Sequence, residues 1–388
     1  MDPVKVGIIG IGNIGSAHAS AVYSGEVDGM KLAALCDTDQ AKLSVLKEKY
    51  PSVPMFLNAE EMMKSGLVDA VIISVPHYGH PPLAIMAFSH GLHVITEKPG
   101  GVSCSEVKKM IAAAKTSGKV FGVMFNQRNN SLFAYAKELV ASGKLGDIKR
   151  SVWIITNWYR KQCYYDSGSW RATWSGEGGG VLLNQAPHNL DIWQWICGMP
   201  SAIRAECNVG KYHNIEVEDE ATIFAEYPNG ATGVFITSTG DYPGTNRLEI
   251  SGTKGKIVIE NGKLSFSSFL YDEKDFRMMP ENAQNPIEVT EICDKPYNGH
   301  VDILKNFTRA ILFGEPLLAP GEDSLKELTI SNAAYLSSWT DQKICLPIDD
   351  SLFDSLLRKK IEESPITNKK QITYFPFSDY LGRWNTNW

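Results

Sequence analysis

The sequence lacks the features that mark secreted, zinc-binding and membrane proteins. Its seven cysteines are odd in number, lie scattered along the chain and form no CxxC pair. Free thiols are therefore expected, rather than a disulfide framework or a metal site. No charged leader with an apolar segment opens the chain, and no apolar run is long enough to span a bilayer. We expect a cytoplasmic protein with no membrane partner and no bound metal.

Strong excess charge is also missing. The net charge of −6 at neutral pH argues against a nucleic acid or an anionic membrane as the partner. Hydrophobic residues make up 43% and charged residues 21% of the 388 positions, which is typical of an ordinary globular protein. This length is too great for one typical domain and suits two.

The chain opens on a glycine-rich turn between an expected strand and an expected helix. Residues 5–9 form an apolar, β-branched run, and residues 16–22 can be helical. Between them, Gly10, Gly12 and Gly15 form the pattern G-x-G-x-x-G. Gly10 permits the tight turn, Gly12 lets a pyrophosphate approach the backbone, and Gly15 lets helix and strand pack closely. The pattern predicts a dinucleotide-binding turn.

A second feature supports this interpretation. The free N–H groups at the start of the helix, around Asn13 and Ile14, would hold the phosphates. The next expected strand, 31–36, ends at Asp37, about 20 residues beyond the last glycine, where a carboxylate would bind the adenosine ribose. Asp37 would repel a 2′-phosphate, so NAD is favoured over NADP. The alternative is that Asp37 only caps the turn 37–39.

Strands and helices alternate in the first third of the chain, with no hairpin signal. This alternation predicts an α/β domain over 1–126, with a doubly wound parallel sheet of the Rossmann type. Expected strands lie at 5–9, 31–36, 68–74, 92–96 and 119–125, and expected helices at 16–22, 40–49, 59–65, 81–90 and 105–117.

Longer alternating strands predict a second, α+β domain over 127–345, built on a large and mainly antiparallel sheet. Pro228-Asn229-Gly230 is a strong hairpin turn between two of these strands. The segment 272–294 is polar, and we expect it to be irregular. Expected strands lie at 151–158, 202–209, 220–227, 231–239, 247–251, 256–260 and 263–269, and expected helices at 132–142, 299–313 and 323–340.

A C-terminal extension over 346–388 ends in an aromatic-rich tail, 364–388. These aromatic rings would be wasted in water, so we expect the tail to pack on its own body or on a neighbouring subunit. An open sheet face in the second domain commonly buries itself in a subunit contact. We therefore expect a homodimer or a homotetramer.

Ligands of a doubly wound sheet bind beyond the carboxyl ends of its strands. Three polar stretches fall there, at 74–80, 96–99 and 125–128. In the first two stretches, the expected cofactor contacts are Ser74, Pro76, His80, Glu97 and Lys98.

Lys98 is the strongest catalytic candidate among them. It follows an apolar strand directly, with an acid before it and a proline after it to fix the turn. A lysine in a crevice beside a nicotinamide can have a depressed pKa or donate a proton to a forming alkoxide. The alternative is an ordinary surface lysine at a strand end.

The second domain contains another dense stretch, residues 170–191. An expected helix over 184–196 would place Asn184 and His188 on one face, with Asp191 three residues further on. Taken alone, this pattern favours structural roles, with Asn184 as an N-cap and His188 as a core histidine bonded to Asp191 or a backbone carbonyl.

A polar and aromatic segment precedes that stretch. Aromatic faces stack on the C–H faces of sugar rings, while arginine and asparagine bind hydroxyl groups. A plain packing role explains some of these rings equally well. The expected substrate contacts here are Asn157, Tyr159, Tyr164 and Arg171.

These motifs together resemble the Gfo/Idh/MocA family of sugar and inositol oxidoreductases. The resemblance covers residues 4–340 and rests on four marks. They are the opening glycine turn, Pro76-His-Tyr-Gly-His80, Glu97-Lys98-Pro99, and Gly178-Gly-Gly180 followed by Asn184, His188 and Asp191.

The resemblance implies a mechanism. Lys98 and His188 would meet at the nicotinamide from opposite domains, with Lys98 orienting the reacting hydroxyl and His188 exchanging its proton. Gln127 and Arg128 match a family stretch near the nicotinamide and the substrate, so Gln127 is expected at the cofactor and Arg128 at the substrate. Trp170 and Arg171 resemble a family pair beside the cofactor.

One departure from the family pattern concerns Asn184, where many members carry an aspartate. Without that charge His188 should be a weaker base, unless Asp191 or Glu177 substitutes for it. More of the proton transfer would then fall on Lys98.

These features predict an NAD-dependent oxidoreductase that acts on a secondary hydroxyl of a sugar, glycoside or polyol. Two alternatives stay open. One is a glycoside hydrolase that retains its NAD and works through transient oxidation and elimination. The other is a non-catalytic NAD-binding sensor, which has no need of Lys98 and His188 together.

Overall fold

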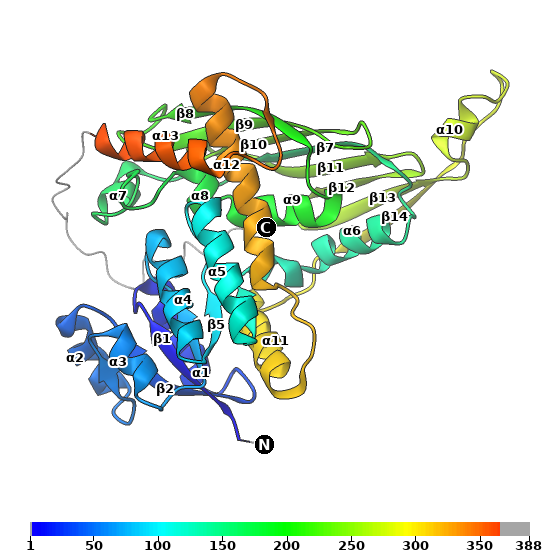
Figure 1. Cartoon of the computed structure of the whole chain (residues 1–388). Coiled ribbons are helices and arrows are strands. Elements are labelled where there is room, and N and C mark those ends of the chain that lie inside the picture. The colour runs from blue at the N-terminus through cyan, green and yellow to red at the C-terminus, as the bar shows by residue number, and fades with distance from the viewer. Residues whose placement is uncertain (1, 365–388) are drawn as a thin grey trace.

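The computed structural model describes residues 2–364, which form two sheets with helices packed around them (Figure 1). The first sheet has six strands, all parallel, in the order β3-β2-β1-β4-β5-β6. The predicted doubly wound parallel sheet is therefore confirmed. Its strands are β1 (Val4–Ile9), β2 (Met30–Cys36), β3 (Met55–Phe56), β4 (Ala70–Ile73), β5 (His93–Thr96) and β6 (Phe121–Val123), and its helices are α1 (Asn13–Tyr23), α2 (Gln40–Lys49), α3 (Ala59–Lys64), α4 (His80–Ser89) and α5 (Cys104–Ser117).

The central strands of this sheet are apolar because helices cover both of its faces. All four residues of β4 are buried, none more than 1% exposed. A strand buried on both sides loses the apolar–polar alternation of a surface strand and reads as a continuous hydrophobic run. The two-residue strand β3 had no sequence signal because it is too short to show any pattern.

The second sheet has nine strands in the order β14-β13-β12-β11-β7-β10-β9-β8-β15. Only the β7–β10 pair is parallel, and the other neighbours are antiparallel. The prediction of a mainly antiparallel sheet is confirmed. Its strands are β7 (Ile148–Ile155), β8 (Ala202–Val209), β9 (Glu218–Glu226), β10 (Thr232–Ser238), β11 (Asn246–Gly252), β12 (Gly255–Glu260), β13 (Lys263–Phe269), β14 (Ile287–Cys293) and β15 (Ile344–Cys345).

The expectation of an irregular segment over 272–294 was wrong in part. Helix α10 (Glu273–Phe276) and strand β14 both fall within it, and β14 pairs with β13 along its whole length. An edge strand whose residues are mostly exposed needs no buried face, so its sequence lacks the clear alternation of an inner strand. Figure 1 shows this end of the sheet extending away from the body.

The second sheet has one covered face and one open face. Helices α6 (Ser131–Ala141), α8 (Val181–Asn184), α9 (Pro187–Cys197) and α12 (Ser324–Thr340) pack over the covered face. Phe224 is 44% exposed on the open face. It lies in a row of cross-strand neighbours with Val234 and Val152, beside the pair Ile236 and Ile154.

One helix returns from the second half of the chain to the first sheet. Helix α11 (Gly299–Phe313) packs on α1 and β1, and its residues Val301, Leu304 and Phe307 share a core with Val6 and Ile8. In the sequence, this helix lies inside the segment 127–345 that we assigned to the second domain. The chain therefore crosses between the two units more than once.

The described part of the C-terminal extension packs on the body. Helix α13 (Asp350–Glu362) lies against α5, and the Phe353 ring stacks on Trp339 with centroids 5.6 Å apart. The aromatic tail beyond residue 364 lies outside the described residues. Within residues 2–364, no helix combines the length and the apolar composition needed to cross a bilayer.

Candidate functional site

The three glycines of the opening motif have different surroundings, in agreement with the separate roles that the motif predicts for them. Gly10 has φ +87°, and a Cβ there would lie 2.7 Å from the carbonyl oxygen of Ser74. A Cβ on Gly15 would lie 2.0 Å from the carbonyl oxygen of Gly10, so these two glycines are required by the fold itself. Gly12 differs, because nothing lies within 4 Å of its Cβ position. Open space over Gly12 suits a phosphate approaching the backbone.

The start of α1 offers the other half of a phosphate site. Gly12 is the N-cap of this helix and supplies no side chain to bond the first N–H groups, which belong to Asn13 and Ile14. Uncapped N–H groups and the helix dipole favour an anion there. The Ser74 hydroxyl donates to the carbonyl of Gly10 at 2.8 Å and so fixes the glycine turn to the end of β4. Pro76 is the N-cap of the 3₁₀ turn that follows β4, His77–Gly79.

Asp37 combines the two roles considered for it. One carboxylate oxygen accepts from the backbone N–H of Ile11 at 2.8 Å, which fixes the glycine turn against the end of β2. The other accepts from the N–H of Asp39 at 3.0 Å, as the turn-capping interpretation predicts. The cap of helix α2 is Asp39 itself. Asp37 therefore stands at the expected ribose position with its charge already oriented.

Glu97 is the centre of a buried charged cluster that the sequence did not reveal. Its carboxylate lies 2.7 Å from Nε2 of His18 in α1, and the His18 ring contacts His300 of α11 with centroids 5.7 Å apart. Burial alone would raise the pKa of Glu97, but the His18 bond and the nearby His300 and Lys98 outweigh burial and lower it. An ionised Glu97 thus joins the glycine helix to the Lys98 turn.

His80 binds the backbone of the turn that carries Lys98. Its ring nitrogens lie 2.7 Å from the carbonyl oxygen of Pro99 and 2.8 Å from that of Val75, and its side chain is fully buried. Burial lowers the pKa of His80. Since both ring nitrogens face backbone carbonyls, the structure gives His80 a positioning role in place of the cofactor contact that we expected.

Lys98 crosses from the first unit to the second. Its Nζ donates to the backbone carbonyl of Asn184 at 2.6 Å. Two further contacts join the units nearby, from His77 to the carbonyl of Glu177 at 2.9 Å and from the Tyr78 hydroxyl to the carbonyl of Trp174 at 2.7 Å. Burial lowers the pKa of the Lys98 amine. An amine with this environment gives up its proton at lower pH than an exposed lysine does.

The expected continuous helix over 184–196 is two helices. Helix α8 ends at Asn184 and α9 begins at Pro187, which has no N–H with which to continue the hydrogen bonding of α8. Asn184 is therefore no N-cap. Its side-chain amide instead donates to the carboxylate of Glu177, which is 2% exposed. The amide thus binds the carboxylate that could replace the missing aspartate.

His188 lies in the first turn of α9 and is 5% exposed. Burial lowers its pKa well below the usual value, and the neighbouring Lys98 and His300 lower it further. The imidazole is thus neutral at physiological pH and able to accept a proton. The carboxylate of Asp191, its suggested partner, is bound by Arg128 and Gln194.

Arg128 occupies a place that we did not expect. Its guanidinium is 1% exposed and binds both carboxylate oxygens of Asp191, at 2.6 and 2.8 Å. It also donates to Asp323 at 2.7 Å and to the carbonyl of Leu318 at 3.0 Å. With these donors engaged, the structure corrects the expected substrate contact to a structural one that joins α9 to the segment before α12.

Tyr164 of the aromatic segment contacts Asn184, the residue whose carbonyl binds Lys98. The Tyr164 hydroxyl donates to the side-chain oxygen of Asn184 at 3.5 Å and accepts from Arg171 at 2.9 Å. The Arg171 guanidinium lies over the rings of Tyr164 and Trp170, 4.7 and 4.5 Å from their centroids. Trp170 in turn contacts the His77 ring of the first unit. These residues form one wall of the site.

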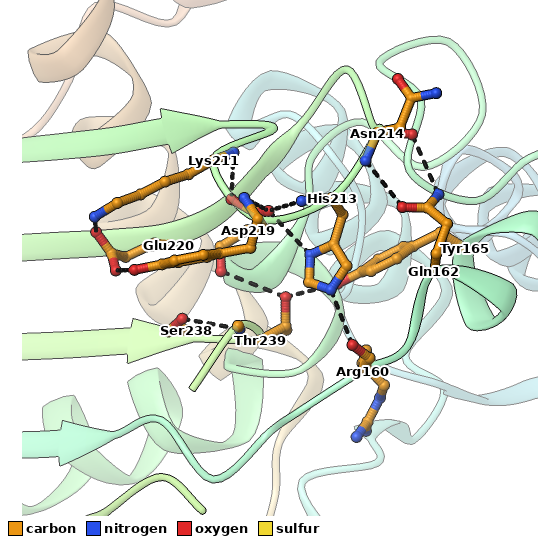
Figure 2. Close-up of polar contacts among 12 residues, drawn as sticks. Arg160, Gln162, Tyr165, Lys211, His213, Asn214, Asp219, Glu220, Ser238 and Thr239 are labelled. Atoms are coloured by element: carbon orange, nitrogen blue, oxygen red, sulfur yellow. Dashed lines mark hydrogen bonds and ion pairs between the residues drawn. The ribbon is translucent and has the colours of Figure 1, made fainter. Parts of the chain in front are cut away.

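Figure 2 shows how this segment is fixed to the second sheet. His213 lies with Nδ1 3.0 Å from the carboxylate of Asp219 and Nε2 2.9 Å from the carbonyl of Arg160. Asp219 is fully buried and also accepts three backbone N–H groups of the loop 211–213. The Tyr165 hydroxyl is 2.7 Å from that of Thr239. The backbone on both sides of Tyr164 is therefore held rigidly.

The other two residues expected in this segment lie elsewhere. The Tyr159 ring is 41% exposed and packs against Tyr242, with centroids 5.4 Å apart. The Asn157 side-chain oxygen is buried and has no hydrogen-bond partner among residues 2–364. Neither residue contributes to the contacts around Lys98, so the structure does not group them with Tyr164 and Arg171.

Gln127 lies in a 3₁₀ turn (Asn126–Asn129) beside the buried cluster. It is 2% exposed and accepts a hydrogen bond from Tyr297 at 3.0 Å. Tyr297 and His300 had no motif to mark them, because only the return of α11 to the first sheet brings them here. His18 had a weak signal, since it follows the glycine motif by one helical turn.

Comparisons with known proteins agree with this architecture. Residues 4–125 match the family described as an oxidoreductase family with an NAD-binding Rossmann fold, GFO/IDH/MocA, and residues 133–258 match its C-terminal domain. Myo-inositol 2-dehydrogenase of Thermotoga maritima is 26% identical over 86% of this chain and 96% of its own length. The scyllo-inositol 2-dehydrogenase (NAD(+)) of Bacillus subtilis is 27% identical over 66% of this chain and 73% of its own length.

Solved structures share the whole fold. The WlbA dehydrogenase of Bordetella pertussis, in complex with NADH and UDP-GlcNAcA, has a TM-score of 0.76 and 24% identity over 89% of this chain and all of that one. A levoglucosan dehydrogenase in complex with NADH and levoglucosan has a TM-score of 0.75 and 20% identity over 89% of this chain and all of that one.

Proposed function

The chain belongs to the GFO/IDH/MocA family of NAD-binding oxidoreductases, and from this premise we propose that it transfers hydride between nicotinamide and a secondary hydroxyl of a sugar, glycoside or polyol. The observation that carries the proposal is the position of the Lys98 amine, which reaches from the first unit to the carbonyl of Asn184 in the second. His188 is close enough for its pKa to be lowered by the charge of Lys98. The two groups suited to proton transfer therefore act on each other electrostatically.

The chain's own residues supply binding and proton transfer. Bound nicotinamide supplies the hydride acceptor. The Lys98 amine hydrogen-bonds the reacting hydroxyl and orients it, while the neutral imidazole of His188 accepts its proton. Arg171 and Tyr164 bind neighbouring hydroxyls of the substrate. Because burial lowers the pKa of both Lys98 and His188, each group is neutral, and able to accept a proton, at lower pH than it would be in water.

The decisive experiment is a panel of inositols, sugars and glycosides with NAD and with NADP, followed by the absorbance of the reduced cofactor. We expect reduction of NAD by at least one polyol or sugar, and a weaker response with NADP because Asp37 repels a 2′-phosphate. Glycoside cleavage without added NAD and without net NADH would identify the hydrolase alternative. NAD binding with no reduction across the panel would identify the sensor.

We also infer that the open face of the second sheet is a subunit contact. An apolar row that contains Val152, Val234 and Phe224 is costly to leave in water. Light scattering is expected to give the mass of two or four chains. Phe224→Lys should shift that mass towards one chain, whereas Tyr242→Lys, at an 83% exposed ring on a loop, should not. A monomeric wild-type protein would contradict this inference.

A further inference from the structure

A carboxyl group without a partner is buried beneath the Lys98 turn. Glu327 in α12 is fully buried, and neither of its side-chain oxygens has a hydrogen-bond partner in the described part of the chain. Every other buried carboxylate around Lys98 is bonded, since Glu97 binds His18, Glu177 binds Asn184 and Asp191 binds Arg128. A buried polar group left unpaired costs stability, and such groups concentrate at functional sites.

Helix α12 brings this carboxyl to the turn that carries Lys98. At the first residue of α12, a Cβ on Gly100 would lie 2.5 Å from Oγ of Ser324, so the turn and the helix are in contact there. Two turns further along, the Asn332 amide donates to the carbonyl of Val102 at 3.0 Å. Glu327 lies between these contacts, three residues after Ser324, on the same side of the helix.

The charges around Glu327 come from four neighbouring segments. The turn contributes Glu97 and Lys98, α9 contributes His188 and Asp191, and the 3₁₀ turns contribute Arg128 and Asp323. Arg128 is already neutralised by Asp191 and Asp323. Lys98 is therefore the cation that Glu327 can act on, and each group acts electrostatically on the other.

We propose that Glu327 is a positioning residue for the reaction proposed above, one that controls from beneath the turn whether the Lys98 amine holds a proton. An ionised Glu327 favours the ammonium form of Lys98, and a protonated Glu327 leaves the amine neutral. The pair thus shares one proton close to the Lys98 turn. Burial raises the pKa of Glu327 well above its usual value, as does the nearby Asp191, and Lys98 offsets this only in part, so Glu327 holds a proton to higher pH than an exposed glutamate does.

The test compares Glu327→Gln and Glu327→Leu with Glu322→Gln, which alters a partly exposed carboxyl near the start of the same helix. Lys98 acetylation by acetic anhydride is followed over pH by peptide mass spectrometry. Loss of the Glu327 charge should lower the pKa of Lys98, so we expect the midpoint of labelling to fall by about one pH unit in both Glu327 variants. Glu322→Gln should leave it unchanged.

The second readout is stability. Removing an unpaired buried carboxyl should raise the Tm, by roughly 2 °C or more, and most in Glu327→Leu. An unchanged labelling midpoint, or a Tm that falls in both Glu327 variants, overturns the proposal. Neither measurement depends on turnover, so failure here is distinct from failure of the proposed dehydrogenase activity.

Discussion

Replacing Lys98 by methionine is expected to lower kcat by roughly a hundredfold or more while NAD affinity changes only a few-fold. Methionine retains most of the side-chain volume but cannot orient the reacting hydroxyl or exchange its proton. The phosphate and ribose contacts that we propose, at Gly12 and Asp37, belong to other segments and are unchanged by the substitution. The measurement is steady-state turnover with the best substrate of the panel, combined with NAD titration by protein fluorescence.

This substitution also removes the hydrogen bond from Lys98 to the Asn184 carbonyl, so a control must separate chemistry from domain contact. Asn184→Ala keeps that backbone carbonyl and removes the side-chain bonds to Glu177 and Tyr164. We expect it to lower kcat much less than Lys98→Met does, with a similar Tm for both variants. A Lys98→Met enzyme that retains more than about a tenth of its turnover would contradict the role assigned to the amine.

Replacing Arg128 by methionine is expected to reduce the free energy of unfolding by about 3–5 kcal/mol. The substitution leaves Asp191 fully buried with its negative charge and only Gln194 as a partner. The cost at Asp323 is smaller, because its carboxylate retains an ion pair with Lys326 at 2.8 Å. Urea denaturation followed by tryptophan fluorescence measures the change.

A double variant tests the cause of this loss. Arg128→Met with Asp191→Leu removes both buried charges, and we expect it to be more stable than Arg128→Met alone, since the uncompensated charge is gone. If Arg128→Met instead kept the stability of the wild-type protein and raised KM strongly, Arg128 would be a substrate contact after all.

Sequence patterns predicted correctly those parts of the fold whose structure depends mainly on neighbouring residues in the chain. The glycine turn, the alternation of the first sheet and the hairpin at Pro228-Asn229-Gly230 are of this kind, and the structure confirms them. Strand β14 was missed because an exposed edge strand has no buried face to impose a pattern. Pro187 indicated a break between α8 and α9. We predicted one continuous helix instead, because Asn184 and His188 have the spacing of residues on one helical face.

The site was predictable only as far as its motifs extend. Lys98 and Asn184, which each belong to a motif, are in contact through the Asn184 carbonyl, whereas the meeting of Lys98 and His188 at the nicotinamide stays a prediction. The roles of Arg128 and His80 could not be inferred from the sequence. Their partners, Asp323 and Pro99, lie in other segments and reach them only through the packing of the fold. His18, His300 and Glu327 surround the site through helices α1, α11 and α12, and the pattern of each helix shows only that it has a buried side.

The repeated crossing of the chain between its two units has a mechanical consequence. Ser131 bonds Asp294 at 2.9 Å, and Arg128 bonds Leu318 and Asp323, so all the crossings lie together around one 3₁₀ turn. Chain connections gathered at one place restrict how far one unit can slide or twist against the other. Away from these connections the boundary depends on side-chain contacts, among them the hydrogen bonds that His77 and Tyr78 make across it.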